Sequence, residues 1–243
     1  MDMNSTIDRM NACDDQYLAL FCSKGREWGL FVYQDRQLPE LPAHNFLRIP
    51  EHIPEGRLRG LCDVARNTAN ATGRSYLRIE LSHPLHFNSA ASEQWGRYYL
   101  TGDAAFEPAS DNELSFEAVD SDDSAAAFVG FEVDNAADKE FSRRRAERFC
   151  GAYLADNGLT CWLCRRGEQI VGCGELFICE NTAKIANFAV AADEDAEAIK
   201  CALLAHLVRQ GRGHGADLIY YYSTDDVPGF VKDGDGYALK WEF

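Results

Sequence analysis

The stretch Val190-Ala-Ala-Asp-Glu-Asp195-Ala-Glu-Ala-Ile-Lys200-Cys-Ala-Leu-Leu204 decides the fold that this sequence predicts. Residues 184–191, which lead into it, are mostly apolar or small and are typical of a strand. Apolar residues at helical spacing then predict a helix over 194–210. Four acids fall within one turn at the junction: Asp193, Glu194, Asp195 and Glu197. The stretch therefore predicts a strand that passes through an acidic turn directly into a helix.

The sequence around this stretch predicts a complete series of elements between Leu114 and Phe243. In chain order these are a strand at 114–119, helices at 123–133 and 139–156, strands at 160–165, 169–179 and 184–191, a helix at 194–210, a strand at 218–223, a short turn or helix at 227–231 and a strand at 237–243. This order predicts an α/β (α+β) domain in which helices flank a mixed central sheet.

The amino-terminal half shows a shorter series of the same kind. It contains strands at 27–34 and 44–49, a helix at 55–71 that Gly73 ends, a strand at 76–81, and a short helix or strand at 92–99. Both halves thus contain a strand–helix–strand crossover, so an internal duplication and two unrelated crossovers both fit. An acidic, turn-rich segment separates the halves. We expect an amino-terminal half at 1–103, a linker at 104–113 and a second domain at 114–243.

Composition narrows the class of partner. The 243 residues carry a formal net charge of −15. Such a negative surface repels phosphate backbones and anionic lipid, so we expect no nucleic-acid or membrane partner, whereas cationic amines would be attracted. No apolar run is long enough to span a bilayer, and Met1 to Asp15 lack the pattern of a signal peptide. Nine cysteines without a disulfide rhythm favour a reducing, cytoplasmic location.

Two cysteine pairs have spacings that a metal or redox site also uses. Cys161 and Cys164 form a CxxC, and Cys173 and Cys179 follow. The first pair lies in a predicted strand, where residues three apart point to opposite faces, so the thiols would not converge on a metal. We therefore expect buried cysteines that pack as small apolar side chains, and no metal site.

The carboxy-terminal half resembles the GNAT (GCN5-related N-acetyltransferase) superfamily in its order of elements. That family carries V-x-P-x-x-R-G-x-G-x-G/A across its fourth strand and the next helix, followed by a small residue and two leucines. The register holds without a gap from Val190 to Leu204. The motif's arginine falls on Asp195, its first two glycines on Ala196 and Ala198, and its last glycine or alanine on Lys200. The frame is that of the family, and the signature residues are degenerate.

The resemblance implies a site for acetyl-CoA or another acyl-CoA. Strand backbone at Phe188, Ala189 and Val190 would hold the pantetheine arm. The start of the following helix would receive the pyrophosphate. The residues there are Asp195, Ala196, Glu197, Ala198, Ile199 and Lys200. The acids allow a different interpretation, in which Asp193 caps the helix and its neighbours supply the anions that a phosphate would otherwise provide.

The resemblance also points to candidate reacting groups. Glu175, flanked by glycines in a strand, is a possible general base, or an ordinary solvent-facing residue of that strand. The tyrosine that many family members use as an acid is replaced by Phe230 or Val231. Tyr221, one of three consecutive tyrosines on the neighbouring strand, could act instead as a possible acid, or the three could pack the sheet.

Two other groups of side chains admit a catalytic and a structural interpretation. His206, between apolar residues of the helix at 194–210, fits a packed side chain better than a base. A run of arginines on the helix at 139–156 could meet the 3′-phosphate of CoA, although a solvated helix face paired with glutamates fits better. These arginines are Arg143, Arg144, Arg145 and Arg148.

Taken together, these features predict an acyl-CoA-dependent N-acyltransferase that transfers an acetyl group to a small-molecule amine. The alternative is a catalytically inactive GNAT-like scaffold that senses a ligand or binds another protein. The half at 1–103 would be a shortened, degenerate relative of the second domain and would serve an accessory role. The enzyme is favoured by the order of elements, and the alternative by the acidic turn and the missing tyrosine.

Overall fold

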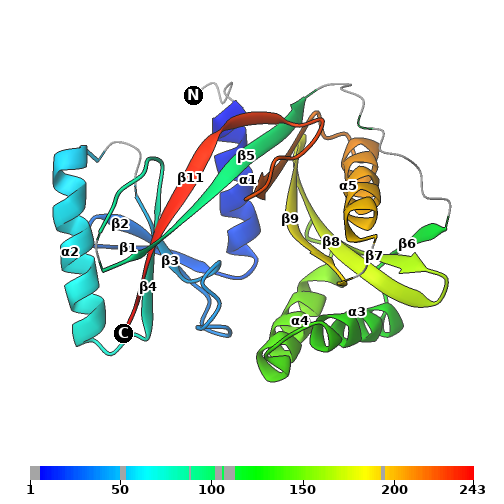
Figure 1. Cartoon of the computed structure of the whole chain (residues 1–243), viewed down its shortest axis with the longest axis horizontal. Coiled ribbons are helices and arrows are strands. Elements are labelled where there is room, and N and C mark those ends of the chain that lie inside the picture. The colour runs from blue at the N-terminus through cyan, green and yellow to red at the C-terminus, as the bar shows by residue number, and fades with distance from the viewer. Residues whose placement is uncertain (1–5, 50–52, 88, 102–105, 107–112, 193–194) are drawn as a thin grey trace. The chain divides into compact units, whose positions relative to one another are not determined.

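The computed structural model describes residues 6–49, 53–87, 89–101, 106, 113–192 and 195–243 (Figure 1). The chain forms two compact units. Unit 1 comprises Met1–Tyr17, Tyr98–Tyr222 and Pro228–Val231, and unit 2 comprises Leu18–Arg97, Ser223–Val227 and Lys232–Phe243. Each unit therefore draws on separate segments of the chain.

Unit 1 is built around one mixed sheet in which β6 to β10 lie side by side in the same order as in the chain. Its elements are α1 (Thr6–Ala19, the last two residues of which belong to unit 2), β6 (Leu114–Ala118), α3 (Asp122–Asp134), α4 (Lys139–Tyr153), β7 (Leu159–Arg166), β8 (Gln169–Cys179), β9 (Thr182–Val190), α5 (Ala196–Gly213) and β10 (Leu218–Ser223). The strand order is β10-β9-β8-β7-β6. Neighbours from β6 to β9 are antiparallel, and α5 crosses over to make β10 parallel to β9.

Helices cover both faces of this sheet (Figure 1). Gly174 of β8 faces α5, because a Cβ atom there would lie 2.7 Å from Leu207 and 3.5 Å from Leu203. The next residue, Glu175, points to the other face, where Tyr153 of α4 and Tyr17 of α1 contact it. The sheet of unit 1 thus has an α5 face and an opposite face that α1 and α4 cover.

Local chemistry explains where the helices of unit 1 begin. Ser121 accepts a hydrogen bond from the backbone N–H of Ser124 and forms a capping box at the start of α3. The carboxylate of Asp138 caps α4 through the N–H of Phe141 at 3.0 Å. Such caps satisfy amide groups that the helix itself leaves unbonded. The left-handed Gly215, with φ of 86°, follows the end of α5.

Unit 2 contains its own series of paired strands, which one long helix, α2 (Glu55–Ala71), covers. Its strands are β1 (Ser23–Glu27), β2 (Leu30–Gln34), β3 (Phe46–Arg48), β4 (Tyr76–Leu81), most of β11 (Val231–Glu242) and the first part of β5 (Ala91–Thr101). The order is β1-β2-β3-β4-β11. β3 and β4 are parallel, and β11 lies antiparallel to β4. Leu58, Cys62 and Ala65 of α2 pack on Ile79 and Trp241 in the core.

The α/β class with a mixed sheet flanked by helices is confirmed, and most predicted elements are present. α2 and β4 have the predicted bounds. Residues 27–34, predicted as one strand, instead span the end of β1 and all of β2. Trp28 and Gly29, with φ of 51° and 82°, form the turn between them. The segment at 92–99 is a strand, and the last strand begins at Val231.

The compact units differ from the predicted halves at both ends of the chain. The first residues, including most of α1, belong to unit 1 together with residues 98–222, whereas the last residues belong to unit 2. Most of the proposed linker, 104–113, lies outside the described residues. No part of the chain before residue 20 was predicted to be a helix, because α1 has only a weakly amphipathic sequence.

Candidate functional site

The parallel strands β9 and β10 separate along their length. Their ladder joins Thr182–Ile185 to Leu218–Tyr221. β9 continues to Val190 alongside β8, and the described residues show no further rung between β9 and β10. Residues 186–190 are half-buried, unlike the fully buried residues 182–185. This leaves a strand edge at the carboxyl ends of the pair, just before the turn into α5.

A β-bulge in β9 coincides with this separation. The pairing of β9 with β8 shifts between Gly174 and Leu176, opposite Glu175, so that two β9 residues face one residue of β8. The side-chain amide of Asn187, in the bulge, donates to Oε1 of Glu175 at 3.1 Å. A bulge bends the strand that carries it and increases its twist. The bulge and its bond to Glu175 therefore mark the point where β9 leaves β10.

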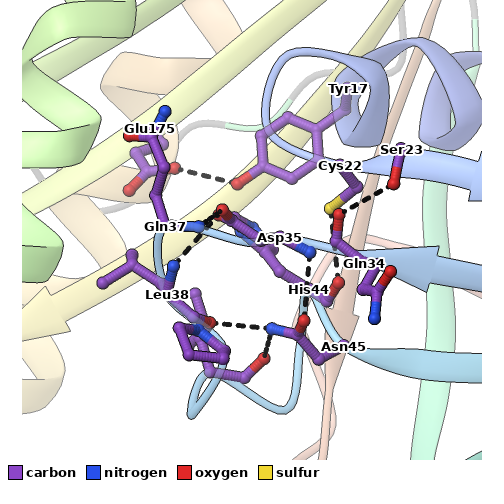
Figure 2. A network of polar contacts seen from close by, with 12 residues as sticks. Tyr17, Cys22, Ser23, Gln34, Asp35, Gln37, Leu38, His44, Asn45 and Glu175 are labelled. Carbon is purple, nitrogen blue, oxygen red and sulfur yellow. Dashed lines mark hydrogen bonds and ion pairs between the residues drawn. The ribbon is translucent and has the colours of Figure 1, made fainter.

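The carboxyl of Glu175 is a buried acceptor for three side chains. It is 1% exposed. Besides Asn187, it accepts from the hydroxyl of Tyr153 at 2.7 Å. It also accepts from the hydroxyl of Tyr17 at 3.4 Å (Figure 2). Burial raises the pKa of Glu175, while the bonds from Tyr153 and Asn187 and the charge of Arg145 oppose that rise. Glu175 is thus neither solvent-facing nor isolated, and α1, α4 and β9 meet at its side chain.

Tyr221 lies on the α5 face, opposite Glu175. Its ring is 6.3 Å from that of Phe188, which packs on the cluster that contains Ile199 and Leu203 of α5. The two candidate reacting groups therefore point to opposite faces of the sheet and do not form one cluster. Phe188 and Val190 direct their side chains to α5 as well, so what they offer toward β10 is backbone.

A second buried network binds α1 to the laddered part of β9 and β10. Lys184 forms an ion pair with Asp14 of α1, with Nζ and Oδ1 at 2.5 Å. Asp14 also accepts from the hydroxyls of Tyr220 at 2.8 Å and Tyr222 at 2.7 Å. Tyr220 and Tyr222 thus pack the sheet, as one interpretation of the sequence expected. Burial raises the pKa of Tyr220 well above its ordinary value.

The start of α5 is the other part of the predicted cofactor site. Asp195 occupies the cap position, but its side chain makes no capping hydrogen bond to the helix. Its carboxylate instead contacts Nη2 of Arg166 at 3.2 Å. Glu197, which is largely exposed, lies 3.9 Å from Nζ of Lys200. Ile199 is fully buried in the core against β7 and β8. Asp193, the expected cap, lies outside the described residues.

The remaining candidates have structural surroundings. His206 is buried, with its ring stacked on Phe116 at 4.2 Å and edge-on to Trp162 at 4.5 Å. Burial lowers the pKa of His206 to about 4. Arg145 pairs with the buried Glu132. These contacts bear out the packed interpretation of His206 and show one of the helix arginines engaged inside the unit.

The cysteines of the CxxC lie on opposite faces of the sheet, as expected. Cys164 packs with Ile199 of α5, whereas Cys161 contacts Cys173 on the other face. Both thiols of the pair are buried, as are Cys173 and Cys179. Burial raises the pKa of Cys161 well above its ordinary value, so the thiol is held protonated.

Sequence reasoning missed the partners that give the site its geometry. Asn187 lies in a predicted strand but has no predicted role, and Arg166 lies just beyond the strand predicted at 160–165. Tyr17 and Asp14 belong to a helix that was not predicted. Their contacts span more than 150 positions of the chain, and nothing in the local sequence signals a contact at that separation.

Comparisons with solved structures identify the fold. A GCN5-related N-acetyltransferase from Kribbella flavida matches at a TM-score of 0.70 and 13% identity, over 96% of this chain and 94% of its own. A functionally unknown conserved protein from Staphylococcus epidermidis matches at 0.70 and 13%, over 91% and 94%. A tandem GNAT protein from the clavulanic acid biosynthesis pathway matches at 0.58 and 14%, over 96% and 95%. No protein-family model and no curated protein matches by sequence.

At identities this low, the likeness establishes the fold alone. The chain has the fold of the GNAT acetyltransferases, including a tandem GNAT, and the resemblance drawn from element order is confirmed at that level. The matches extend over both units, so unit 2 is part of the likeness. Among the described helices, none is both long and apolar enough to cross a membrane.

Proposed function

We propose that the chain is an acyl-CoA-dependent N-acyltransferase whose site lies in unit 1, and that it transfers an acetyl group to a small-molecule amine. The observation that carries the proposal is the separation of β9 from β10 after Ile185 and Tyr221, at a bulge and immediately before α5. An extended chain that bears amides can bond to such a strand edge as an added strand would. The pantetheine arm of CoA is an extended chain of this kind.

The described residues at the start of α5 fit a pyrophosphate better than their sequence suggests. The carboxylate of Asp195 does not occupy the first-turn N–H groups, because it makes no capping bond. Arg166 contacts Asp195, and Lys200 contacts Glu197, so the two described acids each have a cation beside them. An α-helix offers N–H groups and a favourable dipole to an anion at its start. We assign the backbone N–H groups of 196–198 to this role, since the N–H of Ile199 already donates to the carbonyl of Asp195 at 3.0 Å.

The remaining assignments follow from which parts of β9 are accessible. Backbone at Phe188, Ala189 and Val190 would hold the pantetheine, and Lys200 would approach a phosphate oxygen. When bound, the thioester would supply an activated acyl group for direct attack by the amine nitrogen. The protein's part is to hold the two reactants in line at the strand edge, where proximity alone lowers the barrier substantially.

Glu175 and Tyr221 remain the proposed reacting groups, and they differ in how each would reach the reactants at the strand edge. Tyr221 is half-buried beside Phe188, on the α5 face of the strand edge, where a hydroxyl could donate to a leaving thiolate. Glu175 reaches the edge only through Asn187 in the bulge, so a proton would travel along that bond or through water. Glu175 also has a positioning role in this proposal, because it holds the bulged residue.

A second function is favoured by one observation, the placement of the two candidate groups on opposite faces. In that case unit 1 would bind acyl-CoA as a sensor without transferring the acyl group. Calorimetry and a thiol-release assay separate the two functions, since a sensor binds acetyl-CoA and releases no CoA thiol when amines are added.

The first test is a thermal melt with and without millimolar acetyl-CoA, followed by titration calorimetry. A ligand at about 100 times its Kd raises the unfolding free energy by about 2.7 kcal/mol, a shift of several degrees. S-acetyl-N-acetylcysteamine, which has the thioester and one amide but no phosphate, serves as the matched ligand and should give a much smaller shift. Absence of a shift and of heat with acetyl-CoA would refute the proposal.

A further inference from the structure

Unit 2 contains a cavity of about 220 Å³ at the start of its parallel strand pair. The ladder between β3 and β4 joins only Leu47 to Ile79 and Arg48 to Glu80. The cavity is lined mainly by residues 32–34 of β2, by 45–47 around the start of β3, and by 74–78, which lead into and begin β4. At about 30 Å³ per water molecule, it has room for roughly seven waters, or for one small organic molecule.

Three aromatic side chains form much of the wall. Tyr33 and Phe46 are register partners on β2 and β3, and their rings stack with centroids 4.7 Å apart and planes 18° apart. Tyr76 adds a third ring and is held by a hydrogen bond from its hydroxyl to the carbonyl of Pro39 at 3.0 Å. A flat ligand would find ring faces and edges already fixed in place.

The charged side chains of the lining are cationic. The described residues that line the cavity include Arg74 and Arg78 and no aspartate or glutamate, and the carboxylates that pair with these arginines, Glu27, Glu80 and Glu93, lie outside the lining. On a chain with a net charge of −15, a lining of this sign favours an anion where the rest of the surface disfavours one. Arg74 keeps its orientation through Glu27, with Nη2 and Oε2 at 3.1 Å.

One donor in the wall lacks a hydrogen-bond acceptor. Nε of Arg78 is buried and makes no hydrogen bond, and Oε1 of Glu80, with which it forms an ion pair, is 3.7 Å away. The other end of the same guanidinium pairs with Glu93. A buried N–H without an acceptor is costly, so an oxygen that reaches it would gain a charge-assisted bond.

From these features, we propose that this cavity is a binding site for a small planar carboxylate, such as an aromatic acid. The ring would pack against Tyr33, Phe46 and Tyr76, and the carboxylate would bond to Arg78 with Arg74 beside it. Ser75, which is also in the lining, would contribute a hydroxyl. This site does not depend on the proposed acyl transfer, because every residue in it belongs to unit 2.

The test uses 4-fluorobenzoate as the probe and fluorine NMR on the full chain. We expect its resonance to broaden and to yield a measurable Kd with the wild-type protein. 4-Fluorobenzamide, which has the same ring and no charge, should bind at least tenfold more weakly. Arg78→Gln should weaken binding of the acid by about tenfold to a hundredfold, the range for a charge-assisted bond. Arg78→Lys keeps the charge and loses the planar donors, so its affinity for the acid should lie between those of the wild-type protein and Arg78→Gln.

Arg59→Gln is the matched control, since Arg59 lies on α2 of the same unit and outside the cavity lining. It should leave the Kd unchanged. Three results would overturn the proposal: equal binding of acid and amide, unchanged affinity in both Arg78 variants, or no binding of the acid to folded wild-type protein. Thermal melts of each variant establish that it is folded.

Discussion

The parallel strand pairs of the two units open at opposite ends. In unit 1, β9 and β10 are laddered at their beginnings and separate toward their carboxyl ends, beside the start of α5. In unit 2, β3 and β4 are laddered at Arg48 and Glu80, toward the carboxyl end of β3, and separate at their beginnings. Two crossovers with the same order of strand, helix and strand therefore leave space for a ligand at different ends of their strands, at the carboxyl ends in unit 1 and at the beginnings in unit 2.

Side chains at the two junctions account for the difference. In unit 1, Asn187 in the bulge of β9 is held by the buried Glu175 at the point where the ladder ends. In unit 2, Arg48 donates to Glu80 from both Nε and Nη2, at 3.2 and 3.1 Å, across register partners. The bond from Asn187 to Glu175 joins β9 to β8, its antiparallel neighbour. The bonds from Arg48 to Glu80 join the two parallel strands β3 and β4 to each other. Crossover topology alone does not fix where a site forms.

The largest difference between the two parallel strand pairs should appear in how much each one's ion pair contributes to the free energy of unfolding. Lys184→Met removes the cation that pairs with Asp14, which is 4% exposed and accepts hydrogen bonds from the hydroxyls of Tyr220 and Tyr222. Loss of one member of a buried ion pair costs about 3–5 kcal/mol. Arg48→Met in unit 2 breaks a more exposed pair and should cost at most about 1 kcal/mol. Urea denaturation of both variants measures the difference, and equal losses would contradict the contrast.

The crossover helices should differ in their response to pH. α5 carries the buried His206, whereas α2 has no histidine. The pKa of His206 is lowered to about 4 in the folded chain, against 6.5 when unfolded. The unfolded state binds more protons between these values, so stability should fall as pH drops from 6.5 toward 4. The loss at pH 5 is about 2 kcal/mol.

Denaturation at pH 7 and pH 5 measures this loss in the wild-type chain and in His206→Phe. The variant keeps a ring beside Phe116 and should lose this part of the pH dependence. If both proteins respond alike, His206 is not the group responsible.

The bulge in β9 should depend on its side-chain anchor. Asn187→Ala removes one of three donors to the carboxyl of Glu175. Removing one partner of a buried hydrogen bond costs about 1–3 kcal/mol, and we expect a loss of about 1.5 kcal/mol. Acetyl-CoA affinity should fall as well, since the strand edge loses its fixed position. Gln169→Ala, at the exposed start of β8, is the control. Unchanged stability and affinity in Asn187→Ala would show that this side chain does not anchor the bulge.

The smallest effect is expected at the start of α5. Asp195→Arg with Ala198→Gly replaces a carboxylate by a cation and lets the backbone approach a ligand more closely, so acetyl-CoA should bind about tenfold more tightly. Titration calorimetry measures the change, with Glu140→Arg on α4 as a variant of equal charge. If the affinity does not change, the pyrophosphate is not bound at this helix start.

The sequence predicted the elements whose patterning is local. α2 carries apolar residues at helical spacing, and β4 alternates between buried and half-buried residues, so both were predicted with their bounds. The turn at Trp28 and Gly29 was missed, because a tryptophan with positive φ is rare. The bulge at Asn187 was also missed, since no residue type signals which strand residue will be doubled.

The site was predictable only as far as the register of the acidic turn. Asp195 was read as a repulsive charge, because Arg166, which contacts it, stands 29 positions earlier in the chain. Glu175 was placed in a strand with room beside it, but its burial depends on Tyr17 from α1 and Tyr153 from α4. Patterning shows which face a side chain takes, and long-range packing decides what it meets there.

The exchange of terminal segments between the units has a consequence for how the protein is made on the ribosome. α1, the first described helix, completes unit 1 only when β9 and β10 have been synthesised. β11, the last strand, completes the sheet of unit 2 beside β4. Unit 1 therefore has all of its segments once residue 231 has been made, whereas the sheet of unit 2 stays incomplete until β11 follows, although many proteins fold the amino-terminal domain first during synthesis. β4 must therefore wait, with one edge unpaired, until β11 has been synthesised.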